Sequence, residues 1–113
     1  MIQVYRDGHL IARWDDATRT VTRWDRTGAI LEQRPYTAAE HAAATATATQ
    51  ATADANEATL RSRAQTALTT NGEFLALAAP TNAQTLAQVK ALTRQASALI
   101  RLELRALDTL AGT

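Results

Sequence analysis

The segment that decides the fold spans residues 81–110 and reads TNAQTLAQVKALTRQASALIRLELRALDTL. Read as a helix with 3.6 residues per turn, it gathers aliphatic side chains on one side and charged side chains on the other. The apolar stripe consists of Leu86, Val89, Leu92, Ala96, Leu99, Ile100, Leu104, Leu107 and Leu110. A stripe of this kind is stable only when it is buried, so we expect it to be an interface with a partner helix.

The stripe is too wide for a simple two-stranded coiled coil. A two-stranded coiled coil buries a narrow seam of alternating three- and four-residue spacing. Here Glu103 falls within the seam, while Leu86 and Ile100 broaden it. This pattern favours three or more helices around the stripe. Two arrangements stay open: a hairpin within one chain, closed at residues 71–80, and a bundle of helices from several subunits.

A second helix is predicted ahead of this segment. Thr37 and Glu40 have the spacing of a capping box, in which each side chain bonds the backbone N–H of the other residue. The helix is expected at about residues 38–70, followed by a connector at 71–80 and the second helix at about 81–110. Asn71-Gly72 is predicted to end the first helix, because these residues favour the left-handed conformation of a C-cap.

The first predicted helix begins with an unusual tract of alanine and threonine. Between His41 and Ala53 there is no charged residue. A surface of small side chains lets another helix approach closely. The alternative is a flexible linker. The apolar area of this tract is small, so its burial offsets little of the conformational entropy that is lost when the tract becomes ordered.

Residues 1–36 predict a small antiparallel β-meander. Strands are expected at residues 2–6, 9–15, 19–25 and 29–33, with Asp7-Gly8 as a tight hairpin turn. Pro35 is expected to stop the pairing. The complete chain is therefore predicted to be an α+β protein, with a β-meander head at 1–36 and a helical region at 37–113.

Composition limits the classes of function. The chain has 113 residues, of which 46% are hydrophobic but only 4% aromatic, and much of the apolar content is alanine. Such a chain builds a small core, which favours oligomerisation or docking on a partner. The net charge of +1 gives no electrostatic case for nucleic-acid binding. No export signal or membrane-spanning run is read from the sequence.

Candidate catalytic and metal-binding residues are few. The chain has no cysteine, and its two histidines, His9 and His41, lack metal-ligand spacing. Asp15, Asp16 and Asp25 are oxygen donors of the kind calcium takes, but turn formation is their preferred interpretation. No nucleophile, phosphate-binding or dinucleotide motif occurs. We therefore expect no enzyme activity, cofactor or metal.

The N-terminal aromatic residues offer a second kind of candidate site. Tyr5, Trp14 and Trp24 could form an exposed platform for stacking on sugar rings. The preferred interpretation is that they belong to the core of the sheet or to a subunit contact.

The C-terminal segment resembles the end of small minor tail proteins from long-tailed phages that infect Actinobacteria. The match is carried by Phe74–Leu77, Pro80-Thr81, Gln84, Ala87–Gln95 and Leu99–Leu102. The sequence RPYTAAE at Arg34–Glu40, followed by an alanine-rich helix, is also typical of this group. The resemblance covers well over half of the chain.

This resemblance implies a structural component of the virion, made in the host cytoplasm and placed at the tail tip or a fibre. The chain would associate with itself, as a homotrimer, through the stripe at Leu86–Leu110, and with other phage tail proteins. Nucleic acid and membrane are not expected partners. Two alternatives remain: a module that binds host-surface carbohydrate through the N-terminal aromatic residues, and a tail assembly chaperone.

Overall fold

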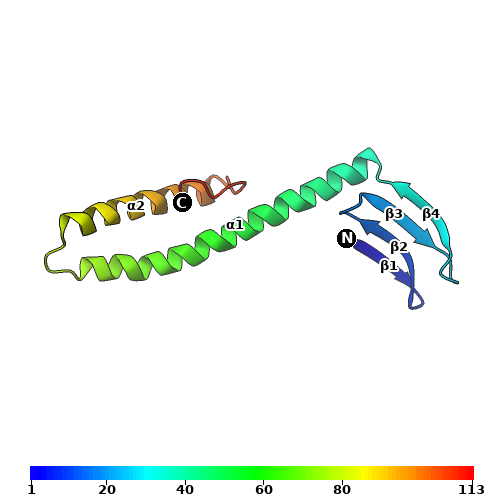
Figure 1. The fold of residues 1–113 in the computed structure, drawn as a ribbon, viewed down its shortest axis with the longest axis horizontal. Helices are drawn as coiled ribbons and strands as arrows, with labels where there is room; N and C mark the ends of the chain where they lie inside the picture. Colours follow the sequence, from blue (N-terminus) through cyan, green and yellow to red (C-terminus); the bar gives the residue numbers. More distant parts are fainter. The chain divides into compact units, whose positions relative to one another are not determined.

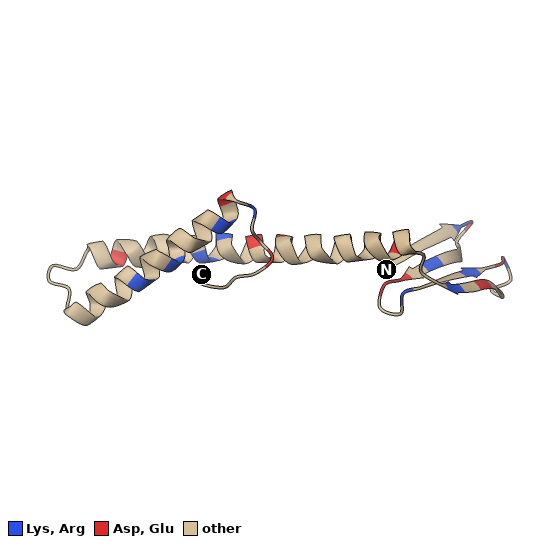
Figure 2. Ribbon diagram, turned by 90° about the horizontal axis from the view of Figure 1, so that it is seen from above, with Lys and Arg blue, Asp and Glu red and all other residues tan.

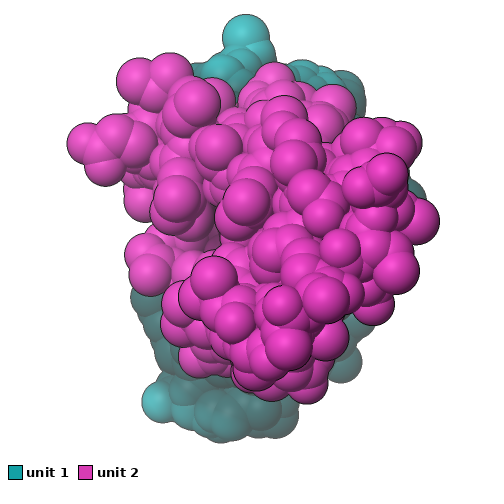
Figure 3. Space-filling view, turned by 90° about the vertical axis from the view of Figure 1, so that its left-hand side faces the viewer, with its two compact units in different colours: residues 1–48 teal, residues 49–113 magenta.

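A computed structural model describes residues 1–113 and has the predicted α+β architecture. A four-stranded antiparallel sheet is followed by two helices (Figure 1). The chain divides into two compact units, Met1–Ala48 and Thr49–Thr113 (Figure 3). The first unit therefore contains the start of the first helix as well as the sheet, and the boundary lies beyond the predicted one at residue 36.

The sheet is a simple meander whose strands follow the order β1-β2-β3-β4. The strands are β1 (Ile2–Arg6), β2 (His9–Asp15), β3 (Thr20–Trp24) and β4 (Ile30–Pro35). Asp7 and Gly8 join β1 to β2 with φ angles of 52° and 80°, as the predicted hairpin turn requires. Pro35 pairs with Thr20 at the end of β4, so the expectation that it stops the pairing is wrong. An edge strand tolerates proline because one side of it needs no ladder donor.

The core of the first unit is small and contains one buried tyrosine. Ala12, Val21 and Tyr36 are its buried apolar residues. The Tyr36 hydroxyl donates to the Asp16 carboxylate at 2.8 Å. Burial, followed by this hydrogen bond to an anion, raises the pKa of Tyr36 to about 12. The phenol therefore stays neutral and acts as a donor inside the unit.

The two helices are α1 (Ala38–Leu75) and α2 (Asn82–Glu103). The capping box predicted at Thr37 and Glu40 is confirmed. Glu40 N donates to Thr37 Oγ1 at 3.3 Å and Thr37 N donates to the Glu40 carboxylate at 2.8 Å. Thr81 and Gln84 form the equivalent pair at the start of α2. Neither helix is long and apolar enough to cross a membrane.

The predicted end of the first helix is wrong. The helix continues through Asn71 and Gly72 to Leu75, and Gly72 does not adopt a positive φ angle. The Asn71 side chain is instead bonded to α2, where its amide donates to Gln95 at 2.8 Å. A glycine lowers helix stability but does not by itself end a helix, so both residues lie within α1.

The predicted end of the second helix is also wrong, because α2 stops at Glu103 rather than near residue 110. Arg105 takes a left-handed φ of 54°. Its N–H donates to Leu102 O at 3.3 Å, and Ala106 N donates to Arg101 O at 2.9 Å. These two bonds define a Schellman motif, which turns the chain out of the helix.

After this turn, the last residues return to α1. Asn56 donates to Leu107 O at 2.7 Å, and Arg105 pairs with Glu57 at 3.0 Å. Leu60 and Leu107 are the two buried apolar side chains of the second unit, with 1% and 3% of their surfaces exposed. The core of this unit therefore lies at the open end of the α1–α2 hairpin.

Candidate functional site

The hairpin buries mainly small and amide side chains between its helices. Five half-buried positions of α2 recur at alternating spacings of three and four residues: Gln88, Ala91, Gln95, Ala98 and Leu102. Ser97 and Arg101 are half-buried as well. Opposite them, Asn71 bonds both amides, accepting from Gln88 at 2.7 Å and donating to Gln95 at 2.8 Å. Amide hydrogen bonds therefore link the two helices, and Leu102 is the one large aliphatic residue of α2 among these inward positions.

An open groove of about 570 Å³ runs between the two helices. Its floor is formed by alanine and leucine, including Leu60, Ala67, Ala91 and Ala98. Polar side chains such as Arg63 and Arg94 also line it. The groove has no constellation of acid, base and nucleophile, so what it offers is a surface for packing.

The predicted stripe lies largely outside the hairpin. Within α2 its large side chains are 48–63% exposed, and these are Leu86, Val89, Leu92, Leu99 and Ile100. Ala96 is exposed as well. These positions stay exposed in the single chain. Charged residues are sparse along both helices (Figure 2). A single chain therefore presents the stripe to its surroundings.

The last three predicted members of the stripe are misplaced because α2 ends before them. Leu104 is the C-cap of α2 and is 71% exposed, whereas Leu107 is buried against α1 and Leu110 is half-buried. These residues do not extend the helical face. Leu107 instead closes the open end of the hairpin within one chain.

Two leucines on α1 are exposed like the stripe on α2, but they were not predicted as part of the candidate interface. Leu68 is 75% exposed and Leu75 is 83% exposed. They are seven residues apart, which places them on the same side of α1. This spacing was visible in the sequence, but two leucines among threonines and alanines give a weak periodic signal.

The N-terminal aromatic residues do not form a common platform. Trp14 is paired with Val21 across β2 and β3, whereas Trp24 lies an odd number of residues from Val21 and points to the other face. Trp14 donates to Glu40 at 2.9 Å, and Trp24 lies under the Arg13 guanidinium at 5.7 Å. Tyr5 is 58% exposed on β1. The predicted group of three is therefore divided between two faces.

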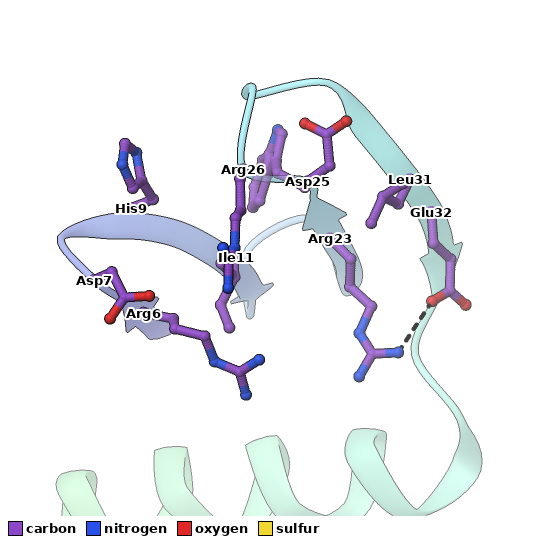
Figure 4. A pocket seen from close by; sticks show the side chains of 10 residues that line it. Arg6, Asp7, His9, Ile11, Arg23, Asp25, Arg26, Leu31 and Glu32 are labelled. Atoms are coloured by element: carbon purple, nitrogen blue, oxygen red, sulfur yellow. Dashed lines mark ion pairs between the residues drawn. The ribbon is translucent and has the colours of Figure 1, made fainter.

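A pocket of about 770 Å³ lies on the sheet unit beside Trp24 (Figure 4). Charges of both signs line it. Arg23 pairs with Glu32 at 3.6 Å, and the Asp25 carboxylate accepts from Thr27 N and Ala29 N in the β3–β4 turn. Much of its charge is therefore already compensated, and the pocket presents no concentrated charge of one sign.

The aspartates considered as metal ligands serve the turns and the chain terminus. Asp15 accepts from Ala17 N at 3.0 Å, and Asp16 pairs with the N-terminal amine at 2.7 Å. No group of three histidine, aspartate or glutamate side chains gathers anywhere in the chain. His9 lies at the pocket on the sheet, and the ring of His41 packs edge-on against Tyr36.

Glu40 joins the sheet to the first turn of α1. Its carboxylate accepts two bonds from Arg34 at 2.7 and 3.0 Å, together with the Trp14 indole N–H. Arg34, the Thr37 backbone and Trp14 hold the pKa of Glu40 well below its usual range. A carboxylate with a lowered folded-state pKa stabilises the fold above its unfolded-state pKa, and this stability is lost as the pH falls.

The sheet unit should therefore lose stability as the pH falls below about 4.3, the usual pKa of glutamate. We expect Glu40→Gln to lower the thermal midpoint at neutral pH and to flatten its dependence on pH between about 5 and 2. Tryptophan fluorescence checks this, because Trp14 contacts Glu40. The matched control is Glu32→Gln, which removes more exposed ion pairs at 3.5 and 3.6 Å. Equal pH profiles for the wild type and Glu40→Gln would contradict the prediction.

Comparison with known proteins finds no matching family model, no matching curated protein and no matching solved structure.

Proposed function

We propose that this protein is a structural component that associates with itself through the exposed aliphatic face of α2. The observation that carries the proposal is the exposure of Leu86, Val89, Leu92, Leu99 and Ile100 in a chain that has already formed its hairpin. Folding of one chain leaves this face without a partner. Exposed apolar surface that is continuous on one element marks an interaction site.

The free energy available from burying this face is of the size that association requires. Burying a fully exposed leucine or similar side chain contributes ~2 kcal/mol. Five residues that are about half exposed, on each of two copies, therefore contribute on the order of 10 kcal/mol. This is comparable with the ~4–15 kcal/mol that association costs in lost freedom of motion. Burial of this face therefore offsets a cost of association in the lower part of that range.

The setting that we propose is a phage tail, and its support is the sequence resemblance. The residues that carry that resemblance include part of the exposed face; they are 74–77, 80–81, 84, 87–95 and 99–102. In this setting the oligomer would stand at the tail tip or a fibre and dock on other tail proteins. The stripe suits three or more helices around it, and either three chains or two hairpins that each supply two helices can provide them.

The absolute mass of the purified chain in solution tests self-association. Light scattering coupled to size exclusion should give a multiple of the 12.2 kDa chain at micromolar concentration. A folded monomer at that concentration would overturn the proposal. Mass spectrometry of purified virions tests the setting, because a structural component remains in the particle whereas an assembly chaperone is absent.

A further inference from the structure

Four exposed leucines form a single row along one flank of the hairpin. The leucine row consists of Leu68 and Leu75 on α1 and of Leu92 and Leu99 on α2. Each follows an inward-facing residue by one position: Ala67, Phe74, Ala91 and Ala98. In two antiparallel helices, residues that follow the contact positions by one lie on the same flank. The row is therefore one surface built by both helices.

The opposite flank has a different character. Three of the five residues that precede the inward-facing positions of α2 by one are basic, namely Lys90, Arg94 and Arg101, and the other two are Ala87 and Ser97. The corresponding residues of α1 include Thr66 and Thr70. One flank is thus aliphatic and the other is basic and polar. This asymmetry selects the aliphatic flank as the surface that is buried on association.

The leucine row ends in two charges of opposite sign. Arg61 lies seven residues before Leu68 on α1, and Glu103 lies four residues after Leu99 on α2. In the single chain Glu103 makes no ion pair, whereas Glu57 pairs with both Arg61 and Arg105. One arginine charge at this end is therefore uncompensated, and so is the carboxylate of Glu103. Arg61 is 69% exposed, and its bonds to Glu57 use Nε and Nη2, which leaves Nη1 to donate to a second acid.

We propose that two copies of this chain pack leucine row against leucine row about a two-fold axis parallel to the helices. α1 of one copy then lies on α2 of the other, and Arg61 of each copy meets Glu103 of the partner subunit. The inference rests on the proposed function and names its partner as a second copy. It sets the number of chains at two, because each hairpin already supplies two helices to a four-helix bundle.

Charge complementarity favours this arrangement over the alternative in which the same faces pack about a two-fold axis perpendicular to the helices. An axis perpendicular to the helices would place α1 on α1 of the partner subunit and leave Glu103 without a basic residue. The parallel axis also fits the spacing of the leucines. Asn71 lies level with Leu92 because it bonds both Gln88 and Gln95. Leu92 of one copy therefore falls between Leu68 and Leu75 of the other, as knobs fit into holes.

A charge exchange tests the pairing. Arg61→Glu and Glu103→Arg should each weaken the dimer about tenfold, because each sets like charges opposite one another. The double variant restores opposite charges and should return the dissociation constant to within about threefold of the wild type. Sedimentation equilibrium measures the constants, and circular dichroism checks that each variant keeps its helices. A double variant as weak as the two single effects combined would overturn the arrangement.

Cysteine cross-linking gives an independent test, because the natural chain has no cysteine. A mixture of Leu68→Cys and Leu92→Cys chains should form a mixed disulfide dimer under mild oxidation, whereas Leu68→Cys alone should not. Efficient cross-linking of Leu68→Cys with itself, or a mass of three chains, would overturn the proposal.

If a charged substitution in the leucine row, such as Leu99→Asp, leaves the oligomer unchanged, the proposed function fails as well. If it dissociates the oligomer but the charge exchange gives no rescue, only the arrangement is wrong.

Discussion

Leu60→Ala is expected to lower the free energy of unfolding of the helical unit by about 3 kcal/mol. This value is within the range for replacing a buried leucine with alanine, which leaves a cavity in the core. Leu60 is 1% exposed and Leu107, the other buried apolar residue of this unit, is 3% exposed. Because the core is so small, few neighbouring side chains can move to fill the cavity that the truncation leaves. Urea unfolding followed by the helical circular dichroism signal measures the change.

Leu104→Ala is the matched control for this variant. Leu104 is the same residue type in the same unit, but 71% of its surface is exposed. Its truncation should change the free energy of unfolding by less than about 0.5 kcal/mol. Equal losses in the two variants would show that the open end of the hairpin is not the core of the unit. The protein concentration must be kept constant, since association also adds stability.

The sheet follows from local signals in the sequence. Asp7-Gly8 requires two positive φ angles, and both residues adopt them. The alternation of His9–Asp15 places Ala12 on the buried face. These features act over a few residues, so they can be read without knowing the rest of the fold. The capping boxes at Thr37 and Thr81 are local in the same sense.

The helix ends were missed because tertiary contacts decide them. Asn71-Gly72 has the residues of a C-cap, but the Asn71 side chain is bonded to Gln88 and Gln95. At the other end, the left-handed residue is Arg105, which lacks the usual glycine signal. Its side chain pairs with Glu57, a residue distant in the sequence. No local pattern contains these long-range bonds.

The candidate surface was predicted in part. The exposed members of the stripe on α2 were identified from periodicity, but that pattern could not say which face the hairpin would use. The hairpin uses the alanine and glutamine positions, which carry little hydrophobic signal, as at Ala91 and Gln95. The stripe is therefore left outside. Leu68 and Leu75 complete the surface only when α1 and α2 are placed side by side.

Leu99→Asp is expected to weaken self-association by about a hundredfold or more, because association would bury a carboxylate without a partner, at a cost of ~3 kcal/mol. Leu99 is 63% exposed in the single chain, so the variant should keep the fold of the hairpin. Circular dichroism tests the fold, and light scattering over a concentration series measures the association.

Leu77→Asp is the control for this experiment, since Leu77 is also exposed, at 42%, but follows α1 in the connector and lies outside the row. Its mass should equal that of the wild type. An unchanged mass for Leu99→Asp would mean that the aliphatic flank does not face another copy. Because Leu92 and Leu99 share that flank, Leu92→Asp should reproduce the dissociation, which separates an effect of the surface from an effect of one position.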